Sequence, residues 1–209
     1  STVCFIPVSA LTTALNSGTA FLSFVLSKTT EFDLSPVRLP LKTVSVKIER
    51  GWHTAYIALG SNIGDSKMYL DNAVKALNEL PTSKVEVVSE YLVTRPYGVT
   101  DQPDFLNGCL KLRTLLYPYE LLAELNRIEK EAGRERIIHW GPRTLDLDII
   151  FYDDLVLEEA DLCIPHVEMH KRKFVLEPLG EIAPYKRHPI SGKRVCEMLV
   201  ESVSYTHLR

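Results

Sequence analysis

The sequence predicts an α+β protein, a ferredoxin-like β-α-β-β-α-β antiparallel sheet with helices packed on it. Two observations predict this fold. Four segments have the length and apolar content of strands, and two segments between them repeat apolar residues every three or four positions, as amphipathic helices do. Their order along the chain is that of the split β-α-β motif, which places both helices on one face of the sheet.

The first elements have clear boundaries. Residues 54–59 form a short apolar strand that runs into a glycine-rich turn. Asp65 or Ser66 can cap the helix that follows, because each offers an oxygen to the first free amides, and Pro81 ends that helix. Residues 85–93 are rich in β-branched side chains and predict the second strand.

The later elements follow the same logic. Residues 105–116 alternate apolar and polar side chains and predict the third strand. Pro118 is placed to open the second helix and Gly133 to end it. Residues 145–152 predict the last strand of the sheet, and shorter helical pieces are expected around residues 172–182.

The composition excludes several classes of protein. The chain has 209 residues, 45% of them apolar, which is enough to bury a core without disulfides or a structural metal. Lys and Arg total 24 against 27 Asp and Glu, so a net charge of −3 gives no general attraction to nucleic acid or to anionic membranes. The cysteines form no C-x-x-C pair, which favours a reducing, cytoplasmic location over a disulfide framework or zinc knuckle. They are Cys4, Cys109, Cys163 and Cys196.

Two aspartates in the last strand give the strongest chemical signal. Because side chains alternate along a strand, Asp146 and Asp148 are expected to project from one face, with Cα atoms about 6.6 Å apart. Such close carboxylates repel each other, and Mg²⁺ ions bound together with substrate phosphates relieve the repulsion. The alternative is that both merely form the solvent side of an edge strand. The side chains expected to face the core are Leu145, Leu147, Ile149 and Phe151.

Basic residues gather near the two aspartates. Gly141 and Pro142 form a rigid turn that places Arg143 beside the carboxylates, where a polyphosphate needs charge neutralisation. Arg134 and Arg136 lie just upstream, although a solvated loop explains these two equally well when they are taken alone. The cluster suggests a triphosphate clamp.

Other motifs are weaker. Residues 60–67 contain two glycines and a lysine but not the phosphate-loop spacing, so a tight strand-to-helix turn is the better interpretation. His166 and His170 lie four residues apart without a third ligand at a fixed offset, which makes a zinc site improbable. Nucleophile-elbow and dinucleotide-binding signatures do not occur.

Three separated motifs together resemble those of the 6-hydroxymethyl-7,8-dihydropterin pyrophosphokinases of folate biosynthesis. They are Tyr-Ile-Ala-Leu-Gly-Ser-Asn-Ile-Gly-Asp at 56–65, Gln-Pro-Asp-Phe-Leu-Asn at 102–107 and His-Trp-Gly-Pro-Arg-Thr-Leu-Asp-Leu-Asp at 139–148. The match runs in order from about residue 54 to residue 200. The family has a pyrophosphokinase-type α/β sandwich, in agreement with the element order.

The resemblance implies the activity of a 2-amino-4-hydroxy-6-hydroxymethyldihydropteridine diphosphokinase. The β,γ-pyrophosphoryl group of ATP passes to the hydroxymethyl oxygen of the pterin, and AMP leaves without a covalent enzyme intermediate. Asp146 and Asp148 match the pair that holds two Mg²⁺ ions, and Arg143, Arg134 and Arg136 match positions that close over the phosphates. The substrates are small molecules, and a lone kinase domain is expected to be a monomer.

The resemblance also implies the substrate contacts. Those on the ATP side are Leu122, Glu129, Trp140, Ile149, His166 and Arg172. Those on the pterin side are Thr94, Tyr97, Gly98, Phe105, Asn107 and Phe174, in which Asn107 reads the polar edge of the ring between the two phenylalanines.

The two ends of the chain differ from the rest. Residues 1–35 have an atypical composition, and residues 36–52 resemble the last strand and linker of a dihydroneopterin aldolase, to which this kinase is fused in some bacteria. The kinase domain is expected at residues 53–201 and a disordered tail at 202–209. No aldolase activity is expected.

Two other classes of protein are open from the residues alone. A metal-dependent nucleotide hydrolase would use the two aspartates but would not need the aromatic pair. A ferredoxin-like ligand-binding or regulatory domain would need neither. Formation of AMP that depends on the pterin separates the kinase from both.

Overall fold

A computed structural model describes residues 48, 51–96, 102–133 and 143–206 of the chain. The atypical segment 1–35 and all but three residues of 36–52 therefore lie outside the described residues. The strands are β1 (His53–Ser61), β2 (Ser83–Val88), β3 (Leu92–Thr94), β4 (Phe105–Thr114), β5 (Asp146–Tyr152), β6 (Leu157–Glu158) and β7 (Cys163–Ile164). The helices are α1 (Ser66–Glu79), α2 (Pro118–Glu131), the short 3-10 helix η2 (Met169–Lys171), α3 (Lys173–Ile182) and α4 (Val195–Thr206).

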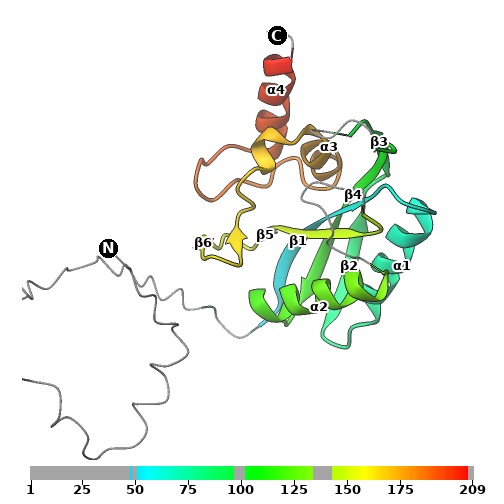
Figure 1. Cartoon of the computed structure of the whole chain (residues 1–209). Coiled ribbons are helices and arrows are strands. Elements are labelled where there is room, and N and C mark those ends of the chain that lie inside the picture. The colour runs from blue at the N-terminus through cyan, green and yellow to red at the C-terminus, as the bar shows by residue number, and fades with distance from the viewer. Residues whose placement is uncertain (1–47, 49–50, 97–101, 134–142, 207–209) are drawn as a thin grey trace, which may run out of the picture. The chain divides into compact units, whose positions relative to one another are not determined.

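The main sheet has the predicted ferredoxin-like topology. Its strand order is β2-β4-β1-β5, with β3 also paired to β4, and each of these pairs is antiparallel (Figure 1). The strands β6 and β7 form a separate small hairpin. Strand β1 lies between β4 and β5 and thus connects the two strands that carry most of the predicted site.

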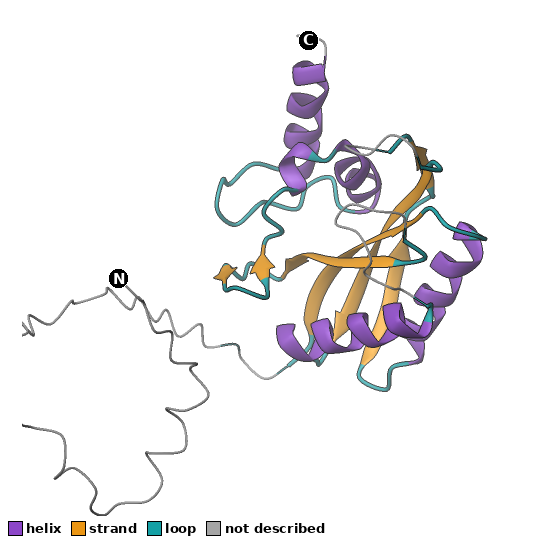
Figure 2. Ribbon diagram, in the orientation of Figure 1, coloured by secondary structure: helices purple, strands orange, loops and turns teal. Residues whose placement is uncertain are grey.

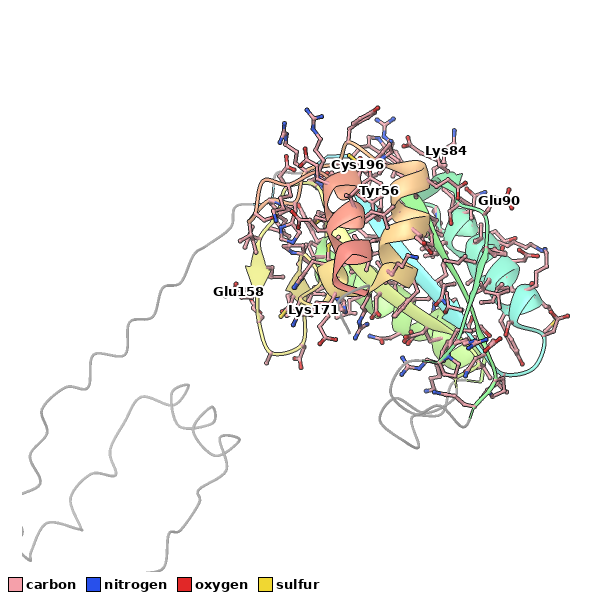
Figure 3. All side chains as sticks on the ribbon, turned by 90° about the horizontal axis from the view of Figure 1, so that it is seen from above. Tyr56, Lys84, Glu90, Glu158, Lys171 and Cys196 are labelled. Carbon is pink, nitrogen blue, oxygen red and sulfur yellow. The ribbon has the colours of Figure 1, made fainter. Side chains whose placement is uncertain are left out.

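Helices cover both faces of the sheet (Figure 2). On one face, α1 and α2 pack their leucines against β1, β4 and β5, as the split β-α-β order predicts; members of this first core include Ile57, Leu70, Leu110 and Leu125. On the other face, α3 and α4 enclose a second core that includes Tyr56 and Phe151. Figure 3 looks onto this face and shows α3 and α4 side by side across the strand of Tyr56.

The helix ends form where the sequence predicts them. The Asp65 carboxylate accepts a hydrogen bond from the Met68 amide at 3.0 Å and so caps α1. Pro118 stands at the first position of α2, where its missing N–H costs nothing. Gly133 follows α2 with a φ of 76°, a left-handed conformation that glycine adopts without strain.

The predicted strand 85–93 is in fact two strands. Strand β2 pairs with β4 up to Val88, opposite Leu110, and β3 resumes at Leu92, opposite Asn107. From Val88 to Leu92 the chain advances four residues, whereas the facing stretch of β4 from Leu110 to Asn107 spans three, so the regular pairing is interrupted between β2 and β3. Ser89 fills the break, since its hydroxyl accepts the Cys109 amide at 2.9 Å.

A β-bulge in β5 corrects another prediction. Ile57 pairs with Ile149 and Tyr56 with Phe151, which leaves Ile150 as an extra residue. The extra residue reverses the alternation, so Leu145, Leu147 and Ile149 lie in the first core as predicted, whereas Phe151 lies in the second. The expectation that Phe151 faces the same core as Leu147 is therefore wrong.

The C-terminal helix corrects a third expectation. Helix α4 runs through Thr206, so residues 202–206 of the predicted disordered tail are helical. The Ser202 hydroxyl donates to the Leu199 carbonyl at 2.7 Å within that helix. Residues 207–209 lie outside the described residues.

Within the described residues the cysteines are free thiols. Cys109 is fully buried in the second core, while Cys163 and Cys196 are half-buried. Burial raises the pKa of the Cys109 thiol well above its usual range, so this group stays protonated and unreactive. In the same part of the chain, no helix combines the length and the apolar character needed to cross a membrane.

The first core gives a direct test of the packing. Leu125 is 1% exposed at the centre of the α2 contact face. Leu125→Ala should lower the free energy of unfolding by about 2–5 kcal/mol, because it leaves a cavity that the sheet cannot fill. Leu115→Ala, at a side chain that is 41% exposed, should change it by less than about 0.5 kcal/mol. Urea unfolding followed by circular dichroism measures both, and equal losses would contradict this arrangement.

Candidate active site

One row of residues across three strands forms the centre of the candidate site. Gly60 of β1 pairs with Asn107 of β4 on one side and with Asp146 of β5 on the other. A Cβ atom on Gly60 would lie 3.4 Å from Asn107 Oδ1 and 3.8 Å from the Cβ of Asp146. The amide and the carboxylate therefore border the same position, which is bare backbone because residue 60 has no side chain.

The row lies on the sheet face that α3 and α4 cover in part. Asn107 is two residues from Cys109 and Gly60 is two from Ala58, and both of these neighbours contact the second core. Asp146 flanks Leu147, which points into the first core, so the Asp146 side chain points to the same face as the row. One end of this face is thus apolar and helix-covered, and the other end carries the polar row.

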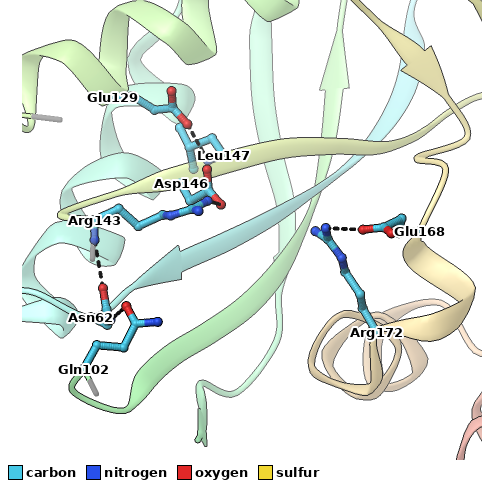
Figure 4. Close-up of polar contacts among 8 residues, drawn as sticks. All are labelled: Asn62, Gln102, Glu129, Arg143, Asp146, Leu147, Glu168 and Arg172. Carbon is cyan, nitrogen blue, oxygen red and sulfur yellow. Dashed lines mark hydrogen bonds and ion pairs between the residues drawn. The ribbon is translucent and has the colours of Figure 1, made fainter. Parts of the chain in front are cut away.

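The two aspartates lie together on this face, as the alternation predicts. Asp148 pairs with Ala58, two residues along β1 from Gly60, and both aspartates are half-buried. Arg143 donates from its guanidinium to the Asp146 carboxylate and its side chain is 23% exposed (Figure 4). The structure therefore brings together the two carboxylates and the guanidinium that the sequence assigned to metal and phosphate.

The pair suits a hard divalent ion. Carboxylate oxygens are the ligands that Mg²⁺ takes in proteins, and Mg²⁺ commonly completes its six positions with water and substrate phosphates. In the described ranges, no group of three or more His, Cys, Asp and Glu side chains forms an ion site. Zinc binding by His166 and His170 thus has no further protein ligand among those residues.

A second basic group stands at the start of α3. Arg172 donates to the Glu168 carboxylate at 2.6 Å (Figure 4) and its guanidinium lies 5.9 Å from the centre of the Phe174 ring. The hydrogen bond from Arg172 holds the pKa of Glu168 below its usual value. The His166 amide donates to the Ile150 carbonyl at 3.1 Å, which ties this segment to the bulge in β5. The predicted residues His166, Arg172 and Phe174 thus belong to one segment, which is tied to β5 at Ile150.

Three of the residues predicted for the pterin, Thr94, Phe105 and Asn107, are neighbours in β3 and β4. Asn107 is 6% exposed, and its Nδ2 donates to the Thr94 hydroxyl at 2.7 Å. Thr94 pairs with Phe105 across the two strands. Thr94 therefore fixes the orientation of the Asn107 amide, with Oδ1 on the side of Gly60.

The residues predicted for the nucleoside lie on the opposite side of β5. Ile149 is buried in the first core and Leu122 packs against it. Glu129 is 4% exposed on α2 and accepts the Leu147 amide at 2.7 Å (Figure 4). Glu129 thus has a structural contact that the sequence did not suggest: it holds the peptide between the two aspartates.

Five predicted residues lie outside the described residues. They are Arg134, Arg136 and Trp140 of the expected phosphate loop, and Tyr97 and Gly98 of the expected pterin loop.

Sequence reasoning assigned no role to Gly60 and Asn62, although both belong to the motif at 56–65. Gly60 is central because of its register with two other strands, and Asn62 is 3% exposed with partners in two distant segments. The sequence offered one signal for Asn62, since it is a polar residue directly after a buried strand. Its partners could not be predicted, because they lie in distant segments of the chain.

Two carboxylates on one face of β5, one of them paired with Arg143, beside a buried amide on the neighbouring strand row, suit an enzyme that transfers a phosphate-containing group to a small acceptor. The family model described as 7,8-dihydro-6-hydroxymethylpterin-pyrophosphokinase (HPPK) matches residues 56–184. The chain belongs to this family, which catalyses pyrophosphoryl transfer in folate biosynthesis.

The names of similar proteins agree with this family assignment. The 2-amino-4-hydroxy-6-hydroxymethyldihydropteridine pyrophosphokinase of Haemophilus influenzae is 47% identical over 130 residues, which are 62% of this chain and 81% of the relative. That of Synechocystis is 47% identical over 154 residues, 74% of this chain and 78% of the relative. The bifunctional protein FolKE of Lactococcus lactis is 44% identical over 149 residues, 70% of this chain but 43% of that protein.

Solved structures support the fold alone. The Plasmodium falciparum HPPK-DHPS triple mutant has a TM-score of 0.62 at 14% identity, over 77% of this chain and 45% of that chain. The A437G variant of the same protein gives a TM-score of 0.63 at 14% identity, over 77% and 42%. The chain spans less than half of these proteins and of FolKE.

The Glu129 contact is testable without any ligand. Glu129→Ala should lower the free energy of unfolding by about 1–3 kcal/mol, because it leaves the Leu147 amide without this acceptor. Glu129→Gln keeps an acceptor of the same size and should lose less. Glu131→Ala, at an exposed residue of the same helix, is the control. Chemical denaturation measures all three; a wild-type value for Glu129→Ala would show that the carboxylate does not hold β5.

Proposed function

We propose that this chain transfers the β,γ-pyrophosphoryl group of ATP to the hydroxymethyl oxygen of 6-hydroxymethyl-7,8-dihydropterin. The products are AMP and the pterin diphosphate, an intermediate of tetrahydrofolate biosynthesis. One observation carries the proposal beyond family membership: the strand register that sets Asn107 and Asp146 on either side of Gly60. It places a group able to read a heterocycle next to a group able to hold a metal–phosphate complex.

Asp146 and Asp148 would hold two Mg²⁺ ions together with the triphosphate. Bound there, the ions would screen the phosphate charges and stabilise the negative charge that develops on the leaving oxygen. The donor set fits, since both groups are carboxylates on one face of β5.

The arginines would neutralise the rest of the triphosphate. Arg143 already pairs with Asp146, so its guanidinium needs to move little to reach a phosphate bound at that carboxylate. Arg172 is oriented by Glu168, and His166 lies two residues before that glutamate. Arg134, Arg136 and Trp140 are proposed to complete this side of the site from their loop.

The pterin would lie between Phe105 and Phe174, with its polar edge on Asn107. The hydrogen bond to Thr94 fixes which way the Asn107 amide faces, and a preorganised amide discriminates donors from acceptors on the ring. Tyr97 and Gly98 are proposed to contribute backbone contacts.

The nucleoside would cross the outer edge of β5. This strand is the last in the sheet order, and Leu122, Glu129 and Ile149 lie on its α2 side, away from the aspartates. A nucleotide with its phosphates at Asp146 and its base near Ile149 would therefore bend over the strand edge.

Catalysis in such a site is positioning and electrostatics. The pterin hydroxymethyl oxygen would attack the β-phosphorus as the α–β bridging oxygen departs with AMP, and no side chain needs to bond to phosphorus. Exclusion of water by the assembled site would prevent ATP hydrolysis. The substrates of this reaction are small molecules; the monomeric state stays a prediction.

The nucleotide product tests the proposal. The protein is incubated with ATP and Mg²⁺, with and without 6-hydroxymethyl-7,8-dihydropterin, and nucleotides are separated by chromatography. AMP that appears with the pterin and is absent without it supports pyrophosphoryl transfer. ADP, or AMP formed equally without the pterin, would instead identify a nucleotide hydrolase.

The aspartates give the matching mutational prediction. Asp148→Asn should lower turnover at least about 100-fold, because the neutral amide binds Mg²⁺ and screens phosphate poorly. The melting temperature should stay near that of the wild type, since Asp148 is half-buried on the open face. Asp154→Asn, at an exposed aspartate just beyond the same strand, should retain activity. Loss of the folded state in Asp148→Asn would mean that this carboxylate is structural.

A further inference from the structure

A buried amide side chain joins the two halves of the candidate site. Asn62 follows β1 directly and is 3% exposed. Its side chain contacts two segments that are far apart in the sequence, one at Gln102 and Pro103 and the other at Arg143 (Figure 4). The first segment leads into β4, which carries Phe105 and Asn107, and the second leads into β5 with its aspartates.

On the β5 side, Asn62 holds both backbone groups of Arg143. The Asn62 backbone N–H donates to the Arg143 carbonyl at 3.1 Å, and the Asn62 side-chain Oδ1 accepts the Arg143 N–H at 2.9 Å. These two bonds lie beyond the β1–β5 ladder, whose last register pair is Gly60 with Asp146. The backbone of Arg143 is therefore fixed beyond the end of the strand itself.

On the β4 side, Asn62 Nδ2 donates to Gln102 Oε1 at 3.1 Å and to the Pro103 carbonyl at 3.2 Å. An amide nitrogen has two protons, one for each acceptor. Backbone groups on both sides also fix the orientation of the amide, because a flipped amide would set its NH₂ against the Arg143 N–H. No carboxylate or apolar side chain of this size can make the same three contacts.

These contacts lie where strand pairing stops. The β1–β4 register ends at Ser61 with Leu106, so residues 102 and 103 lie beyond this ladder. Beyond that point Asn62 links the segment leading to the proposed pterin site with the segment leading to the proposed phosphate site. Its single amide contacts both.

We propose that Asn62 is a positioning residue for the transfer reaction, which sets the pterin-bearing end of β4 against the phosphate-bearing end of β5. The inference rests on the proposed function. Asn62 acts through the Arg143 backbone and through the 102–103 segment, not through contact with substrate. A small misplacement of two reacting groups costs rate more than it costs affinity, because each group keeps its own binding contacts.

Two variants separate the two sides. Asn62→Asp keeps the acceptor for the Arg143 N–H but sets a carboxylate oxygen against the Pro103 carbonyl, so it disrupts the β4 side. Asn62→Ala removes both side-chain links and keeps the backbone bond to the Arg143 carbonyl. Since β4 and β5 stay paired with β1, both variants should fold.

The expected result is a split between kcat and binding. For each variant kcat should fall by about 20-fold or more, whereas the Kd for a non-hydrolysable ATP analogue with Mg²⁺ and the Kd for the pterin change less than about threefold. Active sites are counted from the stoichiometry of analogue binding, so that kcat is expressed per folded site. Asn78→Asp is the control, because the exposed Asn78 also uses Oδ1 to accept a backbone amide, that of Val85, away from the site.

Hydrogen exchange supplies a readout that does not depend on activity. The Arg143 amide should stay protected in the wild type and in Asn62→Asp, which keep its acceptor, and exchange about tenfold faster or more in Asn62→Ala. The inference is overturned if kcat per site stays within about threefold of the wild type in both variants, or if the Arg143 amide is equally protected in all three proteins. If the wild-type protein makes no AMP with the pterin, the proposed function is wrong. Hydrogen exchange alone then shows whether Asn62 holds the Arg143 backbone.

Discussion

The pairing of β1 with β4 on one side and β5 on the other is the constraint on which the rest of the structure depends. Hydrogen bonds fix the register of three strands to the residue, and that register sets Asn107, Gly60 and Asp146 in one row. A slip of one residue would turn the amide or the carboxylate into the leucine-rich first core. The proposed substrate site of this chain therefore depends first on backbone pairing, which sets where these side chains lie.

Departures from regular pairing also serve the site. The bulge at Ile150 lets one strand present aspartates to the open face at its start and Phe151 to the same face further along, where α3 and α4 cover it. Polar side chains supplement the strand pairing: Glu129 holds the Leu147 amide at the outer edge of β5, and Asn62 holds Arg143 and the 102–103 segment beyond the ends of the ladders. The proposed reaction centre is thus framed by buried amide and carboxylate contacts.

What the sequence could and could not predict follows from how local each interaction is. The order of helices and strands along the chain, the cap at Asp65, the helix start at Pro118, and the shared face of Asp146 and Asp148 depend on neighbours within a few residues, and these predictions are correct. The bulge that moves Phe151 and the break at Ser89 depend on how many residues the partner strand offers. The inward contact of Glu129 and the two-sided role of Asn62 depend on partners 18 to 81 residues away, so no periodicity could reveal them.

The most direct test of the account is a crystal structure of the protein with Mn²⁺, a non-hydrolysable ATP analogue and 6-hydroxymethyl-7,8-dihydropterin. Mn²⁺ replaces Mg²⁺ at oxygen ligands and is located by its anomalous signal. The account predicts manganese at Asp146 and Asp148, and the pterin on Asn107 with its hydroxymethyl group directed across Gly60 toward the metal. Manganese bound away from both aspartates, or a pterin on the α1–α2 face of the sheet, would contradict it.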